Sequence, residues 1–202
     1  MKKLFTIAAL AGTLVLTGCG PKESNIERHA EINAPRNLVF QNFAGFQNWS
    51  KWSPWYGLDP NCKYEYYGTP AQVGHGYTWN SENKEVGSGE MKITEMAPND
   101  HIAFDLNFKS PWEAHSTGTM SVAEENGKSV VTWTMHQEHA GFARIMMMFM
   151  DMEKMIGGDF EKGLAKMKEV DEAEAKAAME AQMAAPSDTS AAAVNNNTKK
   201  EE

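Results

Sequence analysis

Methionine is the residue type whose spacing first suggests chemistry in this sequence. Six of the fifteen residues in the segment GFARIMMMFMDMEKM (141–155) are methionine, in a chain that contains 14 of them. Thioether sulfur binds Cu(I), and methionine also adapts to variable apolar partners or fills irregular core space. The segment is therefore a candidate metal site, a candidate contact surface or part of a packed helix.

The residues around these methionines do not favour a metal site. Met147 and Met150 could converge at a spacing of three, but no second methionine cluster supports them. His136 and His139 lie at an odd spacing near the end of a predicted strand, so their side chains would point to opposite faces. We predict no metal site and no cofactor.

Catalytic motifs are also missing from the sequence. No G-x-S-x-G, H-E-x-x-H, C-x-x-C or phosphate-binding loop occurs in the 202 residues. The remaining ionisable candidates are scattered over predicted strands, and a structural or surface role is the simpler interpretation for each. They are His75, His115, His136, Asp105, Glu90 and Glu95. The sequence predicts no catalytic residue and leaves enzymatic activity open.

The first 18 residues have the pattern of a secretory signal peptide, with basic MKK before the apolar run LFTIAALAGTLVLTG. Residues 16–19 (LTGC) resemble the bacterial lipobox, which implies cleavage before Cys19 and lipidation of that cysteine. Residues 19–25 would then form a linker. By the same resemblance, Gly20 favours the outer membrane, facing the periplasm. The alternatives are an ordinary signal peptide with a chance cysteine, or an uncleaved anchor.

The charge of the chain limits its partners. The formal net charge is −8, and it becomes −10 once the signal peptide with Lys2 and Lys3 is removed. An acidic surface argues against nucleic acid and against adsorption to anionic lipid, so we expect membrane contact through the N-terminal lipid only. Besides Cys19 only Cys62 is present, and we expect it to be buried. The oligomeric state stays open.

Residues 26–170 have the composition of one domain of ordinary size. After them, residues 171–185 are rich in alanine and charge, and PSDTSAAAVNNNTKKEE is a low-complexity segment with little to bury. We predict a polar helical extension and a disordered tail over residues 171–202.

Within the domain, the element order predicts an α+β fold. A strand over 26–33 precedes a helix that Pro35 opens, a turn or short second helix, and about six strands that begin near Asn61. HIAFDLNF places Ile102 and Phe104 on one face and Asp105 on the other, and ENGK marks a hairpin turn. From Gly141 to about Val170 the period is helical. A curved antiparallel sheet must then wrap around this long C-terminal helix.

The long helix should bury one continuous stripe of side chains spaced three and four apart. Its members are Phe142, Ile145, Phe149, Met152, Ile156, Phe160, Gly163, Met167 and Val170. Met147, Met148, Met150 and Met155 fall outside the stripe. They are either covered by neighbouring loops, exposed at a lip that contacts a partner, lipid or ligand, or part of a copper site.

The segments INAPRNLVFQNFAGFQNWSKWSPW, VTWTM and MIGGDFEKGLAKMKEV resemble the SRPBCC (START-like) superfamily, in its polyketide cyclase/dehydrase-type branch. The resemblance covers residues 26–170. It implies a helix-grip fold of six to seven strands with a deep apolar cavity between sheet and helix. Many members bind apolar molecules without catalysis, so the resemblance does not provide a reaction.

Large side chains on the inner faces are the candidate ligand-binding residues. In an ordinary domain they would simply fill the core, but around a hollow they make a wall suited to a flat or acyl ligand. The candidates are Trp52, Trp55, Tyr77, Trp79, Phe104, Phe108, Trp112, Trp133, Met135, Phe149, Met152 and Ile156.

Three functions remain possible from the sequence. The leading hypothesis is a lipid-anchored envelope protein that binds a small hydrophobic ligand. The second is a polyketide cyclase-like or hydrolase-like enzyme, which needs an acid or base inside the cavity. The third is an envelope interaction module with a filled core.

Overall fold

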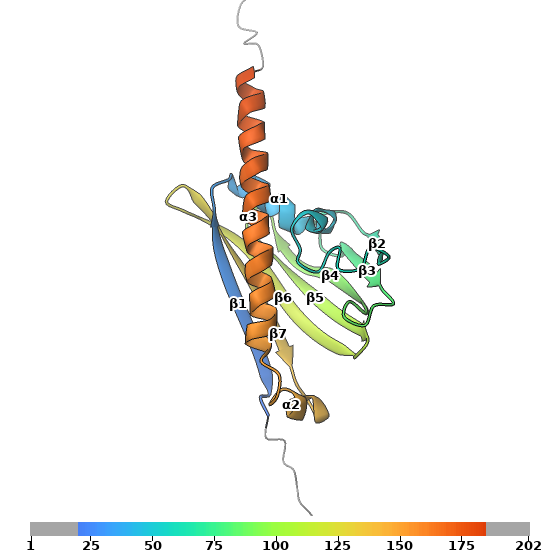
Figure 1. Cartoon of the computed structure of the whole chain (residues 1–202). Helices are drawn as coiled ribbons and strands as arrows, with labels where there is room; N and C mark the ends of the chain where they lie inside the picture. The colour runs from blue at the N-terminus through green and yellow to red at the C-terminus, as the bar shows by residue number, and fades with distance from the viewer. Residues whose placement is uncertain (1–19, 185–202) are drawn as a thin grey trace, which may run out of the picture.

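The computed structural model describes residues 20–184, and a curved seven-stranded antiparallel sheet forms its centre (Figure 1). The strands are β1 (Glu23–Ile32), β2 (Lys63–Tyr67), β3 (Gly76–Asn80), β4 (Ser88–Ala97), β5 (His101–Ser110), β6 (Ala114–Glu125) and β7 (Lys128–Glu138). Their order in the sheet is β1-β7-β6-β5-β4-β3-β2, so β1 returns to pair with the last strand.

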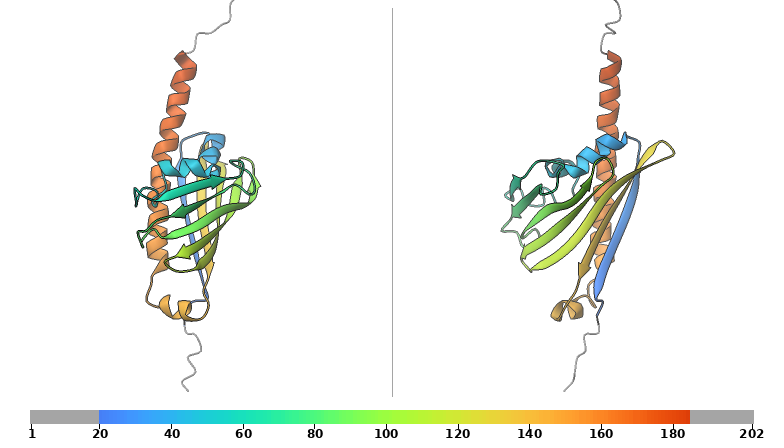
Figure 2. Two further views of the ribbon diagram at one scale, coloured as in Figure 1. Left: turned by 90° about the vertical axis from the view of Figure 1, so that its right-hand side faces the viewer. Right: turned by 180° about the vertical axis from the view of Figure 1, so that it is seen from behind.

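Four helical segments accompany the sheet in the described residues. They are α1 (Arg36–Ala44), the short 3-10 helix η1 (Phe46–Lys51), α2 (Phe142–Met146) and α3 (Met152–Ala184). α3 crosses the concave face beside β1, while α1 and η1 close one end of it (Figure 2). The predicted α+β class, with a curved sheet around a long C-terminal helix, is confirmed as a helix-grip fold.

Alternating side chains explain how the strands form the core. On β5, Ile102 and Phe104 are buried, whereas Asp105 lies half-exposed on the outer face. On β7 the buried apolar residues are Val131, Trp133 and Met135, as their spacing of two requires. Opposite them, α1 contributes Val39, Phe40 and Phe43 and α3 contributes Phe160, Leu164 and Met167. The core therefore lies between the sheet and the helices.

The predicted long helix is interrupted, and this part of the prediction was wrong. α2 ends at Met146, the chain turns through residues 147–151, and α3 begins at Met152. Asp151 provides the physical reason, because its side chain accepts a hydrogen bond from the backbone N–H of Lys154 at 3.0 Å and so caps a new helix. Phe142 and Phe149, predicted to join the buried stripe, are 73% and 81% exposed.

α3 continues past residue 170 to Ala184, through the segment for which a polar helical extension was predicted. Asp171 is still fully buried, while residues 176–184 are exposed and project past the sheet (Figure 1). The predicted tail over residues 185–202 lies outside the described residues.

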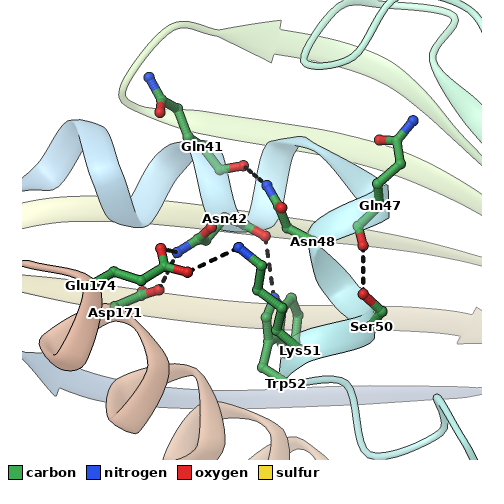
Figure 3. Close-up of polar contacts among 9 residues, drawn as sticks. All are labelled: Gln41, Asn42, Gln47, Asn48, Ser50, Lys51, Trp52, Asp171 and Glu174. Atoms are coloured by element: carbon green, nitrogen blue, oxygen red, sulfur yellow. Dashed lines mark hydrogen bonds and ion pairs between the residues drawn. The ribbon is translucent and has the colours of Figure 1, made fainter. Parts of the chain in front are cut away.

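A polar cluster joins α1, η1 and α3 (Figure 3). The side-chain amide of Asn42 donates to Asp171 at 2.6 Å and to Glu174 at 2.9 Å. Lys51 pairs with Glu174 at 2.9 Å, and the indole N–H of Trp52 donates to the carbonyl oxygen of Asn42 at 3.2 Å. These bonds tie the short helices to the middle of α3.

The N-terminal segment differs from the predicted linker. β1 already begins at Glu23, and the carbonyl oxygen of Lys22 accepts a hydrogen bond from the backbone N–H of His139 at 2.7 Å. The predicted signal peptide (1–18) and Cys19 lie outside the described residues. Among residues 20–184, no helix is long and apolar enough to cross a membrane.

Candidate ligand cavity

A cavity of about 270 Å³ lies between the concave face of the sheet, α3 and the segment that follows η1. Apolar and aromatic side chains make up most of its wall. Its rim includes Leu58 and Glu85, both exposed to solvent, so the cavity communicates with the outside. The lining residues are Trp49, Ser53, Trp55, Tyr56, Leu58, Tyr64, Tyr77, Trp79, Glu85, Val86, Met91, Phe104, Leu106, Phe108, Trp133, Thr134, Met135, Ile156 and Phe160.

The side of the cavity towards α3 is built from stacked rings. Trp133 on β7 and Phe160 on α3 lie face to face, with ring centroids 3.9 Å apart and an angle of 6° between the planes. Trp55 contacts both rings edge-on, at 5.7 Å and 6.1 Å. Such contacts add stability beyond the burial of apolar area, so this side of the cavity is a rigid surface.

Two glycines, one on β4 and one on β6, explain how a hollow forms among so many large rings. Gly118 is directly opposite Phe104 in the β5–β6 pair, and Gly89 is opposite Trp79 in the β3–β4 pair. Each ring lies where a Cβ on its partner glycine would be. The rings of Phe104 and Trp79 therefore pack directly on the backbone of the adjacent strand, which leaves space between these rings and the helices.

Tyrosines form the wall towards β2. Tyr56 and Tyr64 stack with ring centroids 4.3 Å apart, and the hydroxyl groups of Tyr56 and Tyr66 are 3.2 Å apart. Burial raises the pKa of Tyr77 and, with neighbouring groups, the pKa of Tyr64 and Tyr66. These phenols therefore stay neutral near pH 7 and can donate or accept hydrogen bonds.

Beyond the tyrosines, the described lining contains few polar side chains. They are Ser53 and Glu85, and Glu85 lies at the exposed rim. Thr134 also borders the cavity, but it alternates with the inward-facing Trp133 and Met135, and its hydroxyl is 2.6 Å from that of Thr119 on the neighbouring strand. No histidine, aspartate, lysine or arginine is among the described residues that line the cavity.

Eight of the predicted ligand-binding residues line this cavity, although their role in binding stays a prediction. Alternation on the strands and the helical stripe brought them to the inner surface. They are Trp55, Tyr77, Trp79, Phe104, Phe108, Trp133, Met135 and Ile156.

Four predicted residues do not reach the cavity. Trp52 is buried behind its wall, where it packs against Trp49 with centroids 4.6 Å apart. Trp112 is 81% exposed in the short β5–β6 connection, beyond the last paired residues of either strand. Phe149 lies in the turn before α3, and Met152 faces a different hollow.

Several lining residues were absent from the predicted set. Leu106 and Phe160 carried a usable signal, because alternation on β5 and the α3 stripe already placed them on inner faces. Periodicity did not predict that Tyr56 and Tyr64 would meet at the cavity, because they approach each other through the fold of the η1–β2 segment. Cys62 in the same segment is half-buried, which corrects the prediction that it is buried.

The candidate ionisable groups lie elsewhere. His75 is buried with its ring stacked on Phe46 and its Nδ1 2.9 Å from the carbonyl oxygen of Tyr67, outside the cavity lining. The others pair among polar neighbours: His115 with Asp105, His136 with Asn25, Glu90 with Tyr67 and Glu95 with His101. Among the described residues, no group of three or more His, Cys, Asp or Glu side chains is placed to hold a metal ion.

The four methionines outside the predicted stripe divide into two pairs. Met147 and Met150 are half-buried and line a second hollow of about 210 Å³. Met148 and Met155 are 54% and 53% exposed. The second hollow is lined by Pro21, Ser24, Asn25, Ile26, Met147, Met150, Asp151, Met152 and Glu153, at the start of β1.

A curved antiparallel sheet around a long helix, with an apolar cavity between them, places the domain in the helix-grip class of folds. Within that class, residues 24–172 match the sequence model of the family described as polyketide cyclase / dehydrase and lipid transport. The chain belongs to this family, and its resemblance to the SRPBCC superfamily is confirmed.

Solved structures show the same fold. A protein of Nitrosospira multiformis has a TM-score of 0.55 at 16% identity, with 76% of this chain and 99% of the other covered. A Chromobacterium violaceum protein gives 0.52 at 14%, covering 73% and 96%. The Aha1 dimer of Colwellia psychrerythraea gives 0.51 at 17%, covering 74% and 96%. No curated protein sequence is similar enough to count as a match.

Proposed function

We propose that this protein binds one small, largely apolar molecule in the cavity between sheet and α3, while a lipid on Cys19 holds it in the cell envelope. The observation that carries the proposal is the cavity itself, about 270 Å³ of space walled by aromatic rings. A core that served only stability would be filled, because protein interiors are close-packed. This space also counts against the alternative of an interaction module with a filled core.

The wall defines the chemical class of the ligand. The cavity volume of about 270 Å³ is just below the range of about 300–1,000 Å³ usual for ligand pockets, so the ligand is small. Flat rings such as Trp133 and Phe160 suit an aromatic or otherwise planar molecule. Neutral phenols such as Tyr77 can bond a carbonyl or hydroxyl group, and no cation among the described lining residues would pair with an acid.

Binding fits the lining better than acid–base catalysis does. A general base must titrate near the working pH and lie within hydrogen-bond distance of its substrate. Inside the rim the ionisable side chains of the described lining are tyrosines, and burial raises the pKa of Tyr77 further. They can orient a bound carbonyl, but they are poor bases near pH 7.

The envelope location rests on the sequence of residues 1–19. A signal-like segment and a lipobox-like LTGC support processing to a lipidated Cys19. Labelling growing cells with an alkyne fatty acid tests this part: the protein should carry the label, and Cys19→Ser should abolish it. An unlabelled wild-type protein would show that the anchor is absent.

Cavity binding is tested with the neutral fluorescent probe N-phenyl-1-naphthylamine and two variants of β5. Leu106 lines the cavity and its neighbour Asn107 lies on the opposite face. We expect Leu106→Trp to fill the hollow and remove most probe binding, whereas Asn107→Trp should bind like the wild type. Native mass spectrometry of the wild type from its own cells should also show a bound apolar molecule.

Equal probe binding by both variants would contradict the cavity as the site. A wild type that binds no probe and carries no co-purified molecule would contradict ligand binding altogether. Circular dichroism of each variant checks that the sheet and α3 are retained.

A further inference from the structure

An exposed apolar cap lies on the connection between β7 and α3. It consists of Phe142, Met146, Met148 and Phe149, which are between 42% and 81% exposed. These are four of ten large apolar side chains exposed among residues 20–184, yet they fall within eight consecutive residues. Such clustering of exposed apolar groups marks a contact surface rather than chance exposure.

The charge around the cap is unusual for this chain. Residues 140–150 contain one cation, Arg144, and no carboxylate, in a protein whose net charge is −8. The guanidinium of Arg144 donates to the carbonyl oxygen of Gly20 at 2.8 Å and 3.2 Å, and its positive charge remains. The cap therefore presents an apolar surface with a single cation beside it.

The start of the described chain is fixed to this same cap. Gly20 packs on the backbone of Arg144 so closely that a Cβ at residue 20 would overlap the Arg144 carbonyl group. Two residues later, Lys22 is bonded to the backbone of His139, and β1 begins at Glu23. Residues 20–25 are therefore part of the folded domain, and they do not act as a flexible spacer.

We propose that the cap inserts its apolar side chains into the lipid surface to which Cys19 is attached. This inference rests on the lipidation of Cys19 in the proposed function. Consecutive Cα atoms are about 3.8 Å apart, so a lipid on Cys19 begins one residue from the glycine that is clamped to α2. Because no spacer intervenes, the surface around Gly20 and Arg144 must meet the bilayer.

The side chains suit the interface between headgroups and acyl chains. Phenylalanine and methionine lose exposed apolar area there, and the short α2 can lie in the plane of the interface. Asp151 and Glu153 follow the cap directly and are exposed, so they limit insertion to the cap itself. The acidic protein gains nothing from anionic lipid, and the contact should form on largely zwitterionic membranes.

The experiment uses full-length lipidated protein in vesicles of phosphatidylethanolamine with a minority of phosphatidylglycerol. The Cys62→Ser background removes one thiol, and acylated Cys19 has no free thiol. The cysteine of Phe149→Cys is then the single site that reacts with the environment-sensitive dye NBD. Met179→Cys is the matched control, since Met179 is also exposed but lies on the projecting part of α3. We expect a blue shift and loss of iodide quenching at residue 149 only.

The possible outcomes separate this inference from the proposed function. A protein that floats with the vesicles while the dye at residue 149 stays in water would overturn the cap proposal alone. A protein that does not float would show that the lipid anchor is wrong, and the cap proposal would fall with it. A blue shift that grows with protein concentration at fixed lipid would mean that a second copy covers the cap, which also overturns the proposal.

Discussion

Asp171 places a carboxyl group in the interior at the junction of α1 and α3. Its side chain is fully buried, and one oxygen accepts the amide of Asn42 while the other has no partner among the described residues (Figure 3). Burial, together with the charge of Glu174, raises the pKa of Asp171 to about 7. The carboxyl group is therefore protonated in the folded protein over a range in which it ionises in the unfolded chain.

This raised pKa predicts how stability depends on pH. The folded state holds a proton that the unfolded state has lost between the ordinary pKa of 3.8 and about 7, so the contribution of Asp171 to stability falls as pH rises through that window. Asp171→Asn, which stays neutral, should be more stable than the wild type at pH 8 by about 2–4 kcal/mol and similar to it at pH 4. Urea unfolding at several pH values measures this difference.

The control for this prediction is Glu169→Gln, which changes an exposed carboxylate on the same helix. Its stability curve should run parallel to that of the wild type. If Asp171→Asn behaved in the same way, the Asp171 carboxyl group would be ionised in the fold, and the burial argument would be wrong.

At the level of elements, the double glycine Gly157–Gly158 near the start of α3 has two different environments. A Cβ at residue 157 would meet the guanidinium of Arg28, whereas a Cβ at residue 158 would meet nothing within 4 Å. Arg28 on β1 is held by Glu153 at 2.7 Å and by Glu161 at 2.6 Å. Gly157 therefore lets α3 approach β1, and Gly158 has no such role.

Alanine substitutions distinguish the two glycines. Glycine inside a helix is less favourable than alanine by about 0.5–1 kcal/mol, so Gly158→Ala should raise the free energy of unfolding by that amount. Gly157→Ala should show no gain or a net loss, because the new methyl group displaces Arg28 from its two partners. Thermal and urea unfolding of the two variants, side by side, provide the measurement. Equal stabilisation by both would mean that the close approach of α3 to β1 is unimportant.

At the level of the whole molecule, the two ends of the domain differ. The apolar cap and the first described residues lie at one end, and α3 projects from the opposite end (Figures 1 and 2). With 33 residues, α3 is about 50 Å long at 1.5 Å per residue. A protein attached at Cys19 should hold the end of this helix far from the membrane.

Energy transfer to a rhodamine-labelled headgroup tests this orientation. In the Cys62→Ser background, a donor on Met155→Cys near the start of α3 should transfer strongly, and one on Met183→Cys should transfer weakly. Both methionines are exposed, so neither label should disturb the fold. Similar transfer from the two positions would show instead that α3 lies along the membrane.

Local patterns were sufficient to predict most of the fold. Strict alternation identified the inner faces of β5 and β7, and Asn126–Gly127 formed the predicted hairpin turn with φ angles of 52° and 76°. The periodic stripe identified Ile156 and Phe160 on α3. Periodicity failed between Phe142 and Met152, because the chain turns after Met146 and the Asp151 side chain starts a new helix with a different phase. An aspartate carries no apolar signal that would mark this break.

The sequence by itself determined the order of the elements, the family and the inner faces of the long strands, since each depends on residues close together in the chain. Only the tertiary structure decided that the interior is hollow, because this depends on rings such as Phe104 lying down on glycines of the next strand. The pairing of Tyr56 with Tyr64 and the clamp between Gly20 and Arg144 also needed the fold. In the last case, contacts between residues 124 positions apart turn a predicted linker into part of the domain surface.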